Sequence, residues 1–154
     1  MAEVQTGDLA PDFHLMDQNG ETHNLARYRG QWLVLYFYPK DDTPGCTKEA
    51  CEFRDDHDRL ADMGVVLLGV STDDIESHQA FAEKYHLPFP LLSDAQGEVA
   101  KHYGSLWQLG PIRFAKRHSF IIDPEGRIAH IYRDVSPKTH SDEVIAQLQA
   151  LGVH

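Results

Sequence analysis

Hydrophobic residues occur along this chain in short runs that polar and turn-forming segments separate. The run from Trp32 to Tyr38 is continuously apolar or aromatic, which is typical of a central strand covered on both faces. A second buried strand is predicted from Val65 to Val70. Ser119 to Ile122 and Ile128 to Tyr132 flank the turn-forming sequence Asp-Pro-Glu-Gly, so they predict an antiparallel strand pair.

Helical periodicity appears between these strands. Ala50, Phe53 and Leu60 recur on one face of a segment that starts at Pro44, a residue favoured in the first helical position. Gly64 is a typical residue just after a helix end, so one helix is predicted to run to Met63. Three more helices are predicted, over Asp74 to Tyr85, Gly97 to Tyr103 and Ser141 to Leu151.

The order of these elements indicates the fold class. Asp17-Gln18-Asn19-Gly20 is a turn signal between Phe13 to Leu15 and Thr22 to Asn24, so an N-terminal β-hairpin is expected. Strands then alternate with helices, which is an α/β order. We expect one domain over residues 1–154 with a thioredoxin-like fold. Its central mixed β-sheet would be flanked by helices on both faces.

Charge and hydropathy exclude several classes of protein. The formal net charge is −10, from 24 acidic and 14 basic residues, which argues against nucleic acid or an anionic membrane as a partner. The apolar runs are far shorter than the roughly 20 residues that cross a bilayer. The first eight residues lack a basic stretch followed by an apolar run, so no signal peptide is expected. A cytoplasmic location is therefore expected.

The chain has two cysteines, Cys46 and Cys51. In a reducing compartment such a close pair is more often catalytic, redox-sensing or metal-binding than a structural disulfide. Cys46 would lie in the first turn of the helix that starts at Pro44. Unpaired backbone N–H groups and the positive end of the helix dipole favour a thiolate there, and the thiolate is the nucleophilic form.

The residues before Cys46 resemble those of a known family. Pro39, Thr43 and Cys46 have the spacing of the peroxiredoxin signature, and Cys51 at the fifth position after Cys46 resembles the Q-type, or bacterioferritin-comigratory, subfamily. Three other segments are similar to that subfamily: Ala10 to Phe13, Cys46 to Asp55 and Arg117 to Asp123. The resemblance implies a thiol peroxidase.

The resemblance also implies a role for each matching residue. Cys46 would be the peroxidatic cysteine, which a hydroperoxide oxidises to sulfenic acid. Thr43 would donate a hydrogen bond to the peroxide, and Arg117 would stabilise the thiolate and the leaving oxygen through its fixed donors. Pro39 would shield the sulfur from solvent. Glu49 would orient Arg117. Neither a cofactor nor a metal is required by this chemistry.

Cys51 would be the resolving cysteine. Residues five apart on an ideal helix have Cα atoms roughly 8.7 Å apart, whereas a disulfide needs about 4.4–6.8 Å. The start of this helix is therefore predicted to unwind so that Cys51 attacks the oxidised Cys46 and forms an intramolecular disulfide. The family resemblance implies thioredoxin or a similar dithiol protein as reductant, and a monomer.

Three alternatives remain open from the sequence. A thiol–disulfide oxidoreductase without peroxidase activity would favour Cys-x-x-Cys, which is absent, and would leave Thr43 without a task. A metal-binding or chaperone-like module is also conceivable. The two cysteines with His57, however, lack the fourth ligand of a closed zinc site. Arg113 is an alternative to Arg117, because residues 103–116 are the part of the chain least similar to the family.

Overall fold

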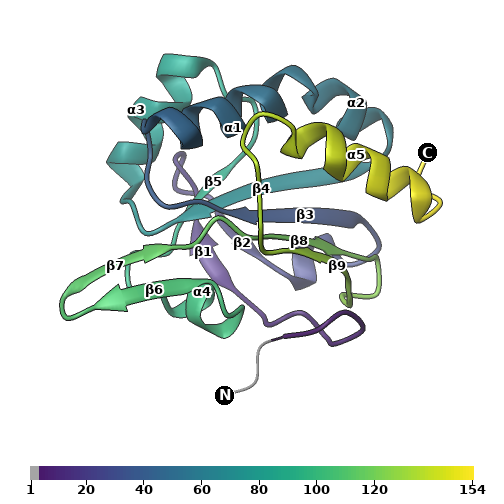
Figure 1. Ribbon diagram of the computed structural model, residues 1–154, viewed down its shortest axis with the longest axis horizontal. Helices are drawn as coiled ribbons and strands as arrows, with labels where there is room; N and C mark the ends of the chain where they lie inside the picture. Colours follow the sequence, from purple (N-terminus) through teal and green to yellow (C-terminus); the bar gives the residue numbers. More distant parts are fainter. Residues whose placement is uncertain (1–3) are drawn as a thin grey trace.

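The computed structural model describes residues 4–154 (Figure 1). Residues 1–3 lie outside the described residues. They belong to the first eight residues, on which the expectation of no signal peptide rests. Over residues 4–154 the chain forms a central sheet of five strands in the order β5-β4-β3-β8-β9. These strands are β3 (Trp32–Phe37), β4 (Val65–Ser71), β5 (Leu91–Ser93), β8 (Ser119–Ile122) and β9 (Ile128–Tyr132). Strands β3, β4 and β5 run parallel to one another, whereas β8 runs antiparallel to both of its neighbours, β3 and β9. The predicted mixed sheet is therefore confirmed.

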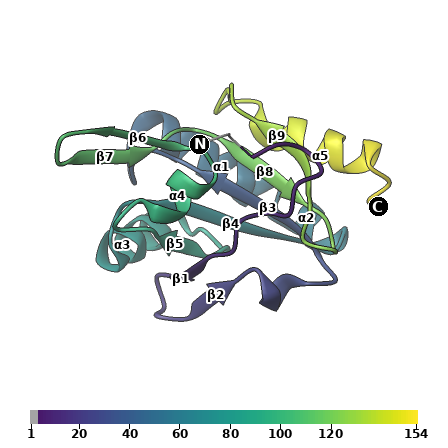
Figure 2. The same cartoon turned by 90° about the horizontal axis from the view of Figure 1, so that it is seen from below.

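The sheet separates two layers (Figures 1 and 2). One layer holds the helices α1 (Pro44–Asp55), α2 (His57–Asp62), α3 (Ile75–Tyr85) and α5 (His140–Ala150). The other layer holds the short helices η1 (Ala26–Tyr28) and α4 (Glu98–His102) and the hairpin of β1 (His14–Met16) and β2 (Thr22–Asn24). The predicted N-terminal hairpin is therefore confirmed, with its first strand displaced by one residue.

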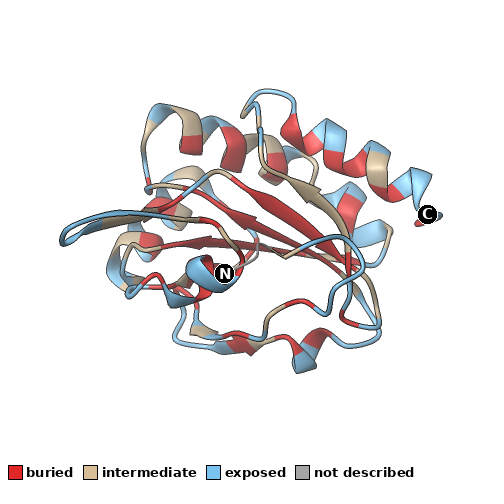
Figure 3. Cartoon of the chain, turned by 60° about the horizontal axis from the view of Figure 1, so that its bottom comes forward, coloured by how far each residue is buried: buried red, intermediate tan, exposed pale blue. Residues whose placement is uncertain are grey.

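Strand β3 supplies both halves of the hydrophobic core. Val34 and Tyr36 belong to the cluster beneath α1 and α5, whereas Leu33, Leu35 and Phe37 belong to the cluster on the opposite face. Successive side chains of a strand point to opposite faces, so a strand buried on both sides must be apolar throughout. Figure 3 shows the buried residues running along the central strands. This packing fixes the end of β3, where the loop to α1 begins.

The single helix predicted from Pro44 to Met63 is wrong. The structure has two helices that meet at Asp56, whose backbone leaves the helical range with φ −97° and ψ 3°. The Asp56 carboxylate accepts a hydrogen bond of 2.6 Å from Ser141 Oγ at the start of α5. This break depends on a tertiary contact, so the helical periodicity of the segment does not reveal it. Gly64 follows α2 with φ 74°, as its predicted place after a helix end requires.

Residues 103–116 contain a second hairpin, made of β6 (Leu106–Leu109) and β7 (Ile112–Ala115). It projects beyond the body of the sheet (Figure 1). Leu109 and Ile112 are 67% and 60% exposed, and Trp107 stacks on Phe114 with ring centroids 4.6 Å apart. The sequence analysis did not predict this hairpin or the short strand β5.

Smaller differences occur at the C-terminus. Helix α5 ends at Ala150, so Leu151 lies outside the predicted amphipathic helix and is 36% exposed. Val144, Ile145 and Leu148 are buried against the sheet as the pattern predicted. Among residues 4–154, no helix has the length and apolar character needed to cross a membrane.

Candidate active site

The loop that follows β3 leads directly into α1 and carries the signature residues. Thr43 stands at the N-cap position with extended backbone angles, φ −89° and ψ 157°. Its hydroxyl donates to the Lys40 carbonyl oxygen at 3.0 Å, and its oxygen accepts no capping hydrogen bond from the backbone of α1. Pro44 and Gly45 form the first helical positions, and Cys46 follows in the first turn. The Cys46 side chain faces the core and is only 1% exposed.

Arg117 lies beside Cys46. Its Nη2 donates to Cys46 Sγ at 3.4 Å, and its Nη1 donates to Glu49 Oε1 at 2.8 Å. Sheet topology explains this proximity. The start of β8 pairs with the end of β3, and the Phe37 N–H donates to the His118 carbonyl oxygen at 2.8 Å. Arg117, two residues before β8, is thereby brought to the first turn of α1.

Arg113 does not reach this position. Its Nη1 donates to the Gln96 carbonyl oxygen at 2.9 Å, on the outer side of the β6–β7 hairpin. Of the two arginines that the sequence analysis considered, Arg117 and not Arg113 therefore supplies the guanidinium beside Cys46. The hairpin contributes differently, because Ile112 and Phe114 line a cleft of about 470 Å³ together with Pro39. This cleft opens at the loop that precedes α1.

Burial and charge act against each other around Arg117. Burial raises the pKa of Glu49 to about 7, and the neighbouring guanidinium of Arg117 limits this rise. Burial opposes the charge on Arg117, but Glu49 and Cys46 outweigh burial and raise the pKa of the guanidinium above its ordinary value. Within residues 4–154, Glu49 Oε2 has no hydrogen-bond partner. A permanent positive charge thus lies against the Cys46 sulfur.

Gly45 leaves room for the guanidinium beside the helix. A Cβ at this position would lie 3.0 Å from Arg117 Nη2, tighter than nine in ten real contacts of this kind, so a side chain here would push the end of Arg117 away. The missing side chain therefore helps the helix backbone and the guanidinium to approach each other closely.

Cys51 lies on the same unbroken helix as Cys46. Both cysteines are free, Cys46 being buried and Cys51 partly exposed. Helix α1 runs from Pro44 to Asp55 and includes both residues. In this conformation Cys46 Sγ contacts Arg117, whereas Cys51 lies on a later turn of α1.

A family model described as AhpC/TSA family matches residues 6–131. This chain belongs to the AhpC/TSA family. It is 43% identical over 152 residues to Peroxiredoxin Bcp of Bacillus subtilis (strain 168), covering 95% of this chain and 96% of that protein. The chain is therefore a peroxiredoxin, similar to the bacterioferritin-comigratory and Q-type proteins, and acts as a thiol-dependent peroxidase.

Solved structures of peroxiredoxins share this fold. The crystal structure of peroxidoxin BcpB from Mycobacterium tuberculosis matches with a TM-score of 0.91 at 38% identity, covering 97% of this chain and 99% of that one. The bacterioferritin comigratory protein of Xanthomonas campestris, studied for its alkyl peroxide reduction activity, matches with a TM-score of 0.87 at 32% identity. That match covers 98% of this chain and 99% of the other. The thioredoxin-like fold expected from the sequence is thereby confirmed.

Two groups of potential metal ligands occur apart from the two cysteines. The structure brings Asp17, Glu21 and His23 together, and likewise Asp41, Asp73 and His78. Neither cysteine nor His57 belongs to these groups within residues 4–154. The second group joins Asp41 of the loop before α1 to Asp73 and His78, which lie more than 30 residues further along the chain, so local sequence spacing does not reveal it.

The histidines of both groups already have protein partners. His23 Nε2 lies 2.7 Å from Asp17 Oδ2, and its Nδ1 is hydrogen-bonded to the Tyr28 hydroxyl. His78 Nδ1 lies 2.7 Å from Asp41 Oδ2, and its Nε2 lies 3.0 Å from the Leu92 carbonyl oxygen. Ring nitrogens used in this way are not free to bind a metal, and we interpret both groups as hydrogen-bond networks.

Proposed function

We propose that Cys46 is the peroxidatic cysteine and Cys51 the resolving cysteine of this peroxidase. The observation that carries the proposal is the contact of 3.4 Å between Arg117 Nη2 and Cys46 Sγ at the N-terminus of α1. A positive guanidinium and the free N–H groups of a first helical turn both stabilise a thiolate. Pro39 and Thr43 belong to the loop that leads into the helix of this sulfur.

In the first step the Cys46 thiolate attacks one oxygen of a hydroperoxide. The new S–O bond forms as the O–O bond breaks, and the other oxygen leaves as hydroxide or alkoxide and takes up a proton. Negative charge moves from sulfur to the leaving oxygen, so donors placed along that line stabilise the transition state. We assign this task to Arg117 Nη2 and to the Thr43 hydroxyl, whose single hydrogen turns from the Lys40 carbonyl oxygen to the peroxide when the substrate binds. Glu49 is the residue that positions Arg117.

In the second step Cys51 attacks the sulfenic sulfur of Cys46, and the hydroxyl group leaves as water. An ideal helix separates these Cα atoms by roughly 8.7 Å, beyond the 4.4–6.8 Å of a disulfide. We therefore propose that the first turns of α1 unwind before the S–S bond forms. An external dithiol, thioredoxin or a similar protein, then reduces the disulfide and returns the chain to its starting state.

Hydrogen peroxide and organic hydroperoxides are the proposed substrates. In the cleft near the loop before α1, Pro39, Ile112 and Phe114 offer apolar contacts to an alkyl group. The rest of its lining is polar or charged: Lys40, Thr72, Asp73 and Arg113. A monomer without cofactor or metal, located in the cytoplasm, stays our expectation from the sequence.

The test is to count free thiols and measure intact mass after one equivalent of hydrogen peroxide. Wild-type protein should lose both thiols and two mass units. In Cys51→Ser a sulfenic acid should be trapped on Cys46. Thiols that react no faster than free cysteine would rule out the proposed roles and would leave thiol–disulfide exchange as the alternative.

A further inference from the structure

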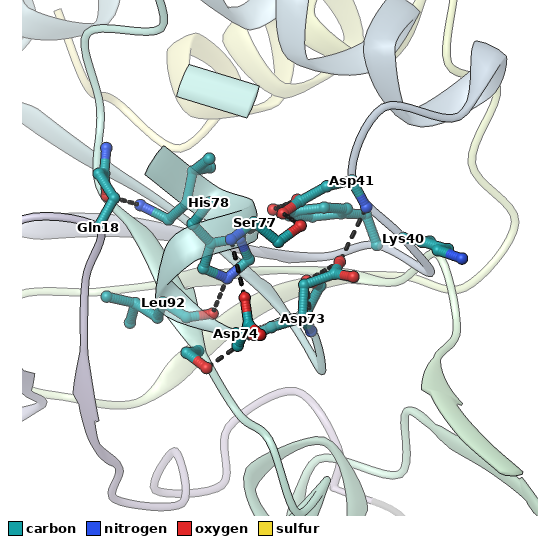
Figure 4. A network of polar contacts seen from close by, with 12 residues as sticks. Gln18, Lys40, Asp41, Asp73, Asp74, Ser77, His78 and Leu92 are labelled. Atoms are coloured by element: carbon teal, nitrogen blue, oxygen red, sulfur yellow. Dashed lines mark hydrogen bonds and ion pairs between the residues drawn. The ribbon is translucent and has the colours of Figure 1, made fainter. Parts of the chain in front are cut away.

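A buried hydrogen-bond network fastens the loop before α1 to α3 (Figure 4). The side chain of Asp41, in this loop, is 3% exposed, and its carboxyl group takes part in three hydrogen bonds. The Tyr38 hydroxyl donates to Oδ1 at 2.6 Å, while Ser77 Oγ and His78 Nδ1 lie 2.8 Å and 2.7 Å from Oδ2. The Asp41 backbone N–H also donates to Asp73 Oδ2 at 2.8 Å. Asp41 is therefore held through both its backbone and its side chain.

The proton content of this network follows from its geometry. His78 is fully buried, and its Nε2 lies 3.0 Å from the Leu92 carbonyl oxygen. A carbonyl only accepts, so Nε2 carries a hydrogen. The contact between Nδ1 and Asp41 Oδ2 needs a second proton, whichever of the two atoms holds it. The pair is thus neutral overall, and removing either partner leaves a buried polar group of the other without its bond.

The next residue of the loop is attached to the same helix. Asp42 adopts a left-handed conformation with φ 60°. Its Oδ2 accepts from Lys84 Nζ at 2.8 Å and its Oδ1 from the Tyr85 hydroxyl at 2.8 Å, both near the C-terminus of α3. Neither cysteine lies on α3. Unwinding of α1 therefore does not require these attachments of the loop to break.

We propose that Asp41 and His78 are positioning residues for the peroxidase reaction. They hold the loop that carries Pro39 and Thr43 in the geometry that peroxide reduction requires, and keep it there while α1 unwinds and refolds. This inference rests on the proposed role of Cys46. A merely structural role would affect only the stability of the protein. The proposed role also makes the rate of Cys46 oxidation depend on the buried pair of Asp41 and His78.

The chain contains a matched control for this proposal. Asp17 and His23 form a second buried pair with the same distance of 2.7 Å, and both side chains are 2% exposed. This pair belongs to the β1–β2 hairpin on the opposite face of the sheet from α1. Replacing His23 removes an equivalent buried hydrogen bond between histidine and aspartate, and it leaves the loop before α1 unchanged.

The experiment compares His78→Ala with His23→Ala, each in the Cys51→Ser background, which isolates the first oxidation step. We measure the rate constant for sulfenic acid formation with hydrogen peroxide, and amide exchange at Asp41 in reduced protein. His78→Ala should slow oxidation at least about tenfold and speed exchange at Asp41 by a similar factor. His23→Ala should change both by less than about twofold, even where its loss of stability is equal.

Asp41→Asn gives a second route should His78→Ala fail to fold. Asparagine keeps the shape of the carboxylate and removes its charge, so it should fold and still slow oxidation of Cys46. The proposal is overturned if these variants oxidise at the wild-type rate, or if His23→Ala slows oxidation equally. A failure of the proposed function looks different, because wild-type Cys46 would then be unreactive while exchange at Asp41 still responded to His78→Ala.

Discussion

Cys46 and Arg117 are 71 residues apart in the sequence, yet Sγ and Nη2 lie 3.4 Å apart in the structure. The Arg117 side chain is 20% exposed, and its guanidinium lies between this sulfur and the fully buried Glu49, which its other terminal nitrogen contacts at 2.8 Å. A charge in such a partly buried position acts more strongly on the sulfur than it would in water. The reactivity of Cys46 should therefore depend on Arg117 in particular rather than on positive charge in general.

Arg117→Lys should slow the oxidation of Cys46 by hydrogen peroxide by about 100-fold to 1,000-fold, the usual loss when one preplaced donor is removed. Lysine keeps the charge but not the fixed fork that contacts Sγ and Glu49 together. Stopped-flow mixing of reduced protein with peroxide gives the rate constant. Arg113→Lys is the matched control, since Arg113 bonds to Gln96 at the hairpin. Equal losses in both variants would contradict the assignment of Arg117.

Gly45→Ala should slow both steps of the reaction. The new Cβ would meet Arg117 Nη2 at 3.0 Å and displace the guanidinium, which slows oxidation of Cys46. Alanine also favours the helix by up to about 1 kcal/mol relative to glycine, which opposes unwinding and slows disulfide formation by about fivefold. Rapid mixing and thiol quenching separate the two rates.

Thr47→Ala serves as the control for Gly45→Ala. It raises the helix propensity of α1 without placing an atom against Arg117. It should slow disulfide formation alone and leave the oxidation rate of Cys46 unchanged. A slower first step in Thr47→Ala would mean that helix stability, and not the space at Gly45, governs the reaction with peroxide.

Glu49 and His140 should contribute to the pH dependence of stability with opposite sign. Burial raises the pKa of Glu49 from 4.5 to about 7, so its contribution to the free energy of unfolding is lost as pH rises through that window. Burial lowers the pKa of His140 from 6.5 to about 4, so its contribution is lost as pH falls through that window. Between about pH 4.5 and 6.5 the two effects should largely cancel.

Glu49→Gln reveals this cancellation. Its stability minus that of wild type should increase with pH between about 4.5 and 7, by at most about 1.4 kcal/mol per pH unit. His140→Gln should show the opposite trend, a difference from wild type that decreases with pH between about 4 and 6.5. Urea unfolding at several pH values gives both differences. A pH-independent difference for Glu49→Gln would show that the folded and unfolded states bind its proton equally.

Disulfide formation should change the protection of α1 and of no other helix on that face. Amides over residues 44–55 should exchange faster in the oxidised protein than in the reduced protein, because Cys46 and Cys51 cannot bond on an intact helix. Amides of α3 should keep their protection. Hydrogen exchange followed by mass spectrometry of both redox forms measures this. Identical protection over residues 44–55 would exclude unwinding as part of the mechanism.

Local sequence determined much of this protein. The apolar run of β3 predicts a strand buried on both faces, and its alternating contacts with two cores agree with that prediction. The spacing of Pro39, Thr43 and Cys46 depends on a short stretch of chain, so it also identifies the family. Such features arise from neighbouring residues, whose geometry is nearly independent of the rest of the molecule.

Tertiary structure decided what depends on distant segments. The helix break at Asp56 depends on Ser141, and the place of Arg117 depends on the pairing of β8 with β3. The network of Asp41 and His78 joins a loop to a helix face, and periodicity alone marks His78 only as one more polar residue. A sequence pattern records which face of an element is apolar. It does not record which buried polar atoms meet across elements, because that depends on how the finished sheet and helices pack together.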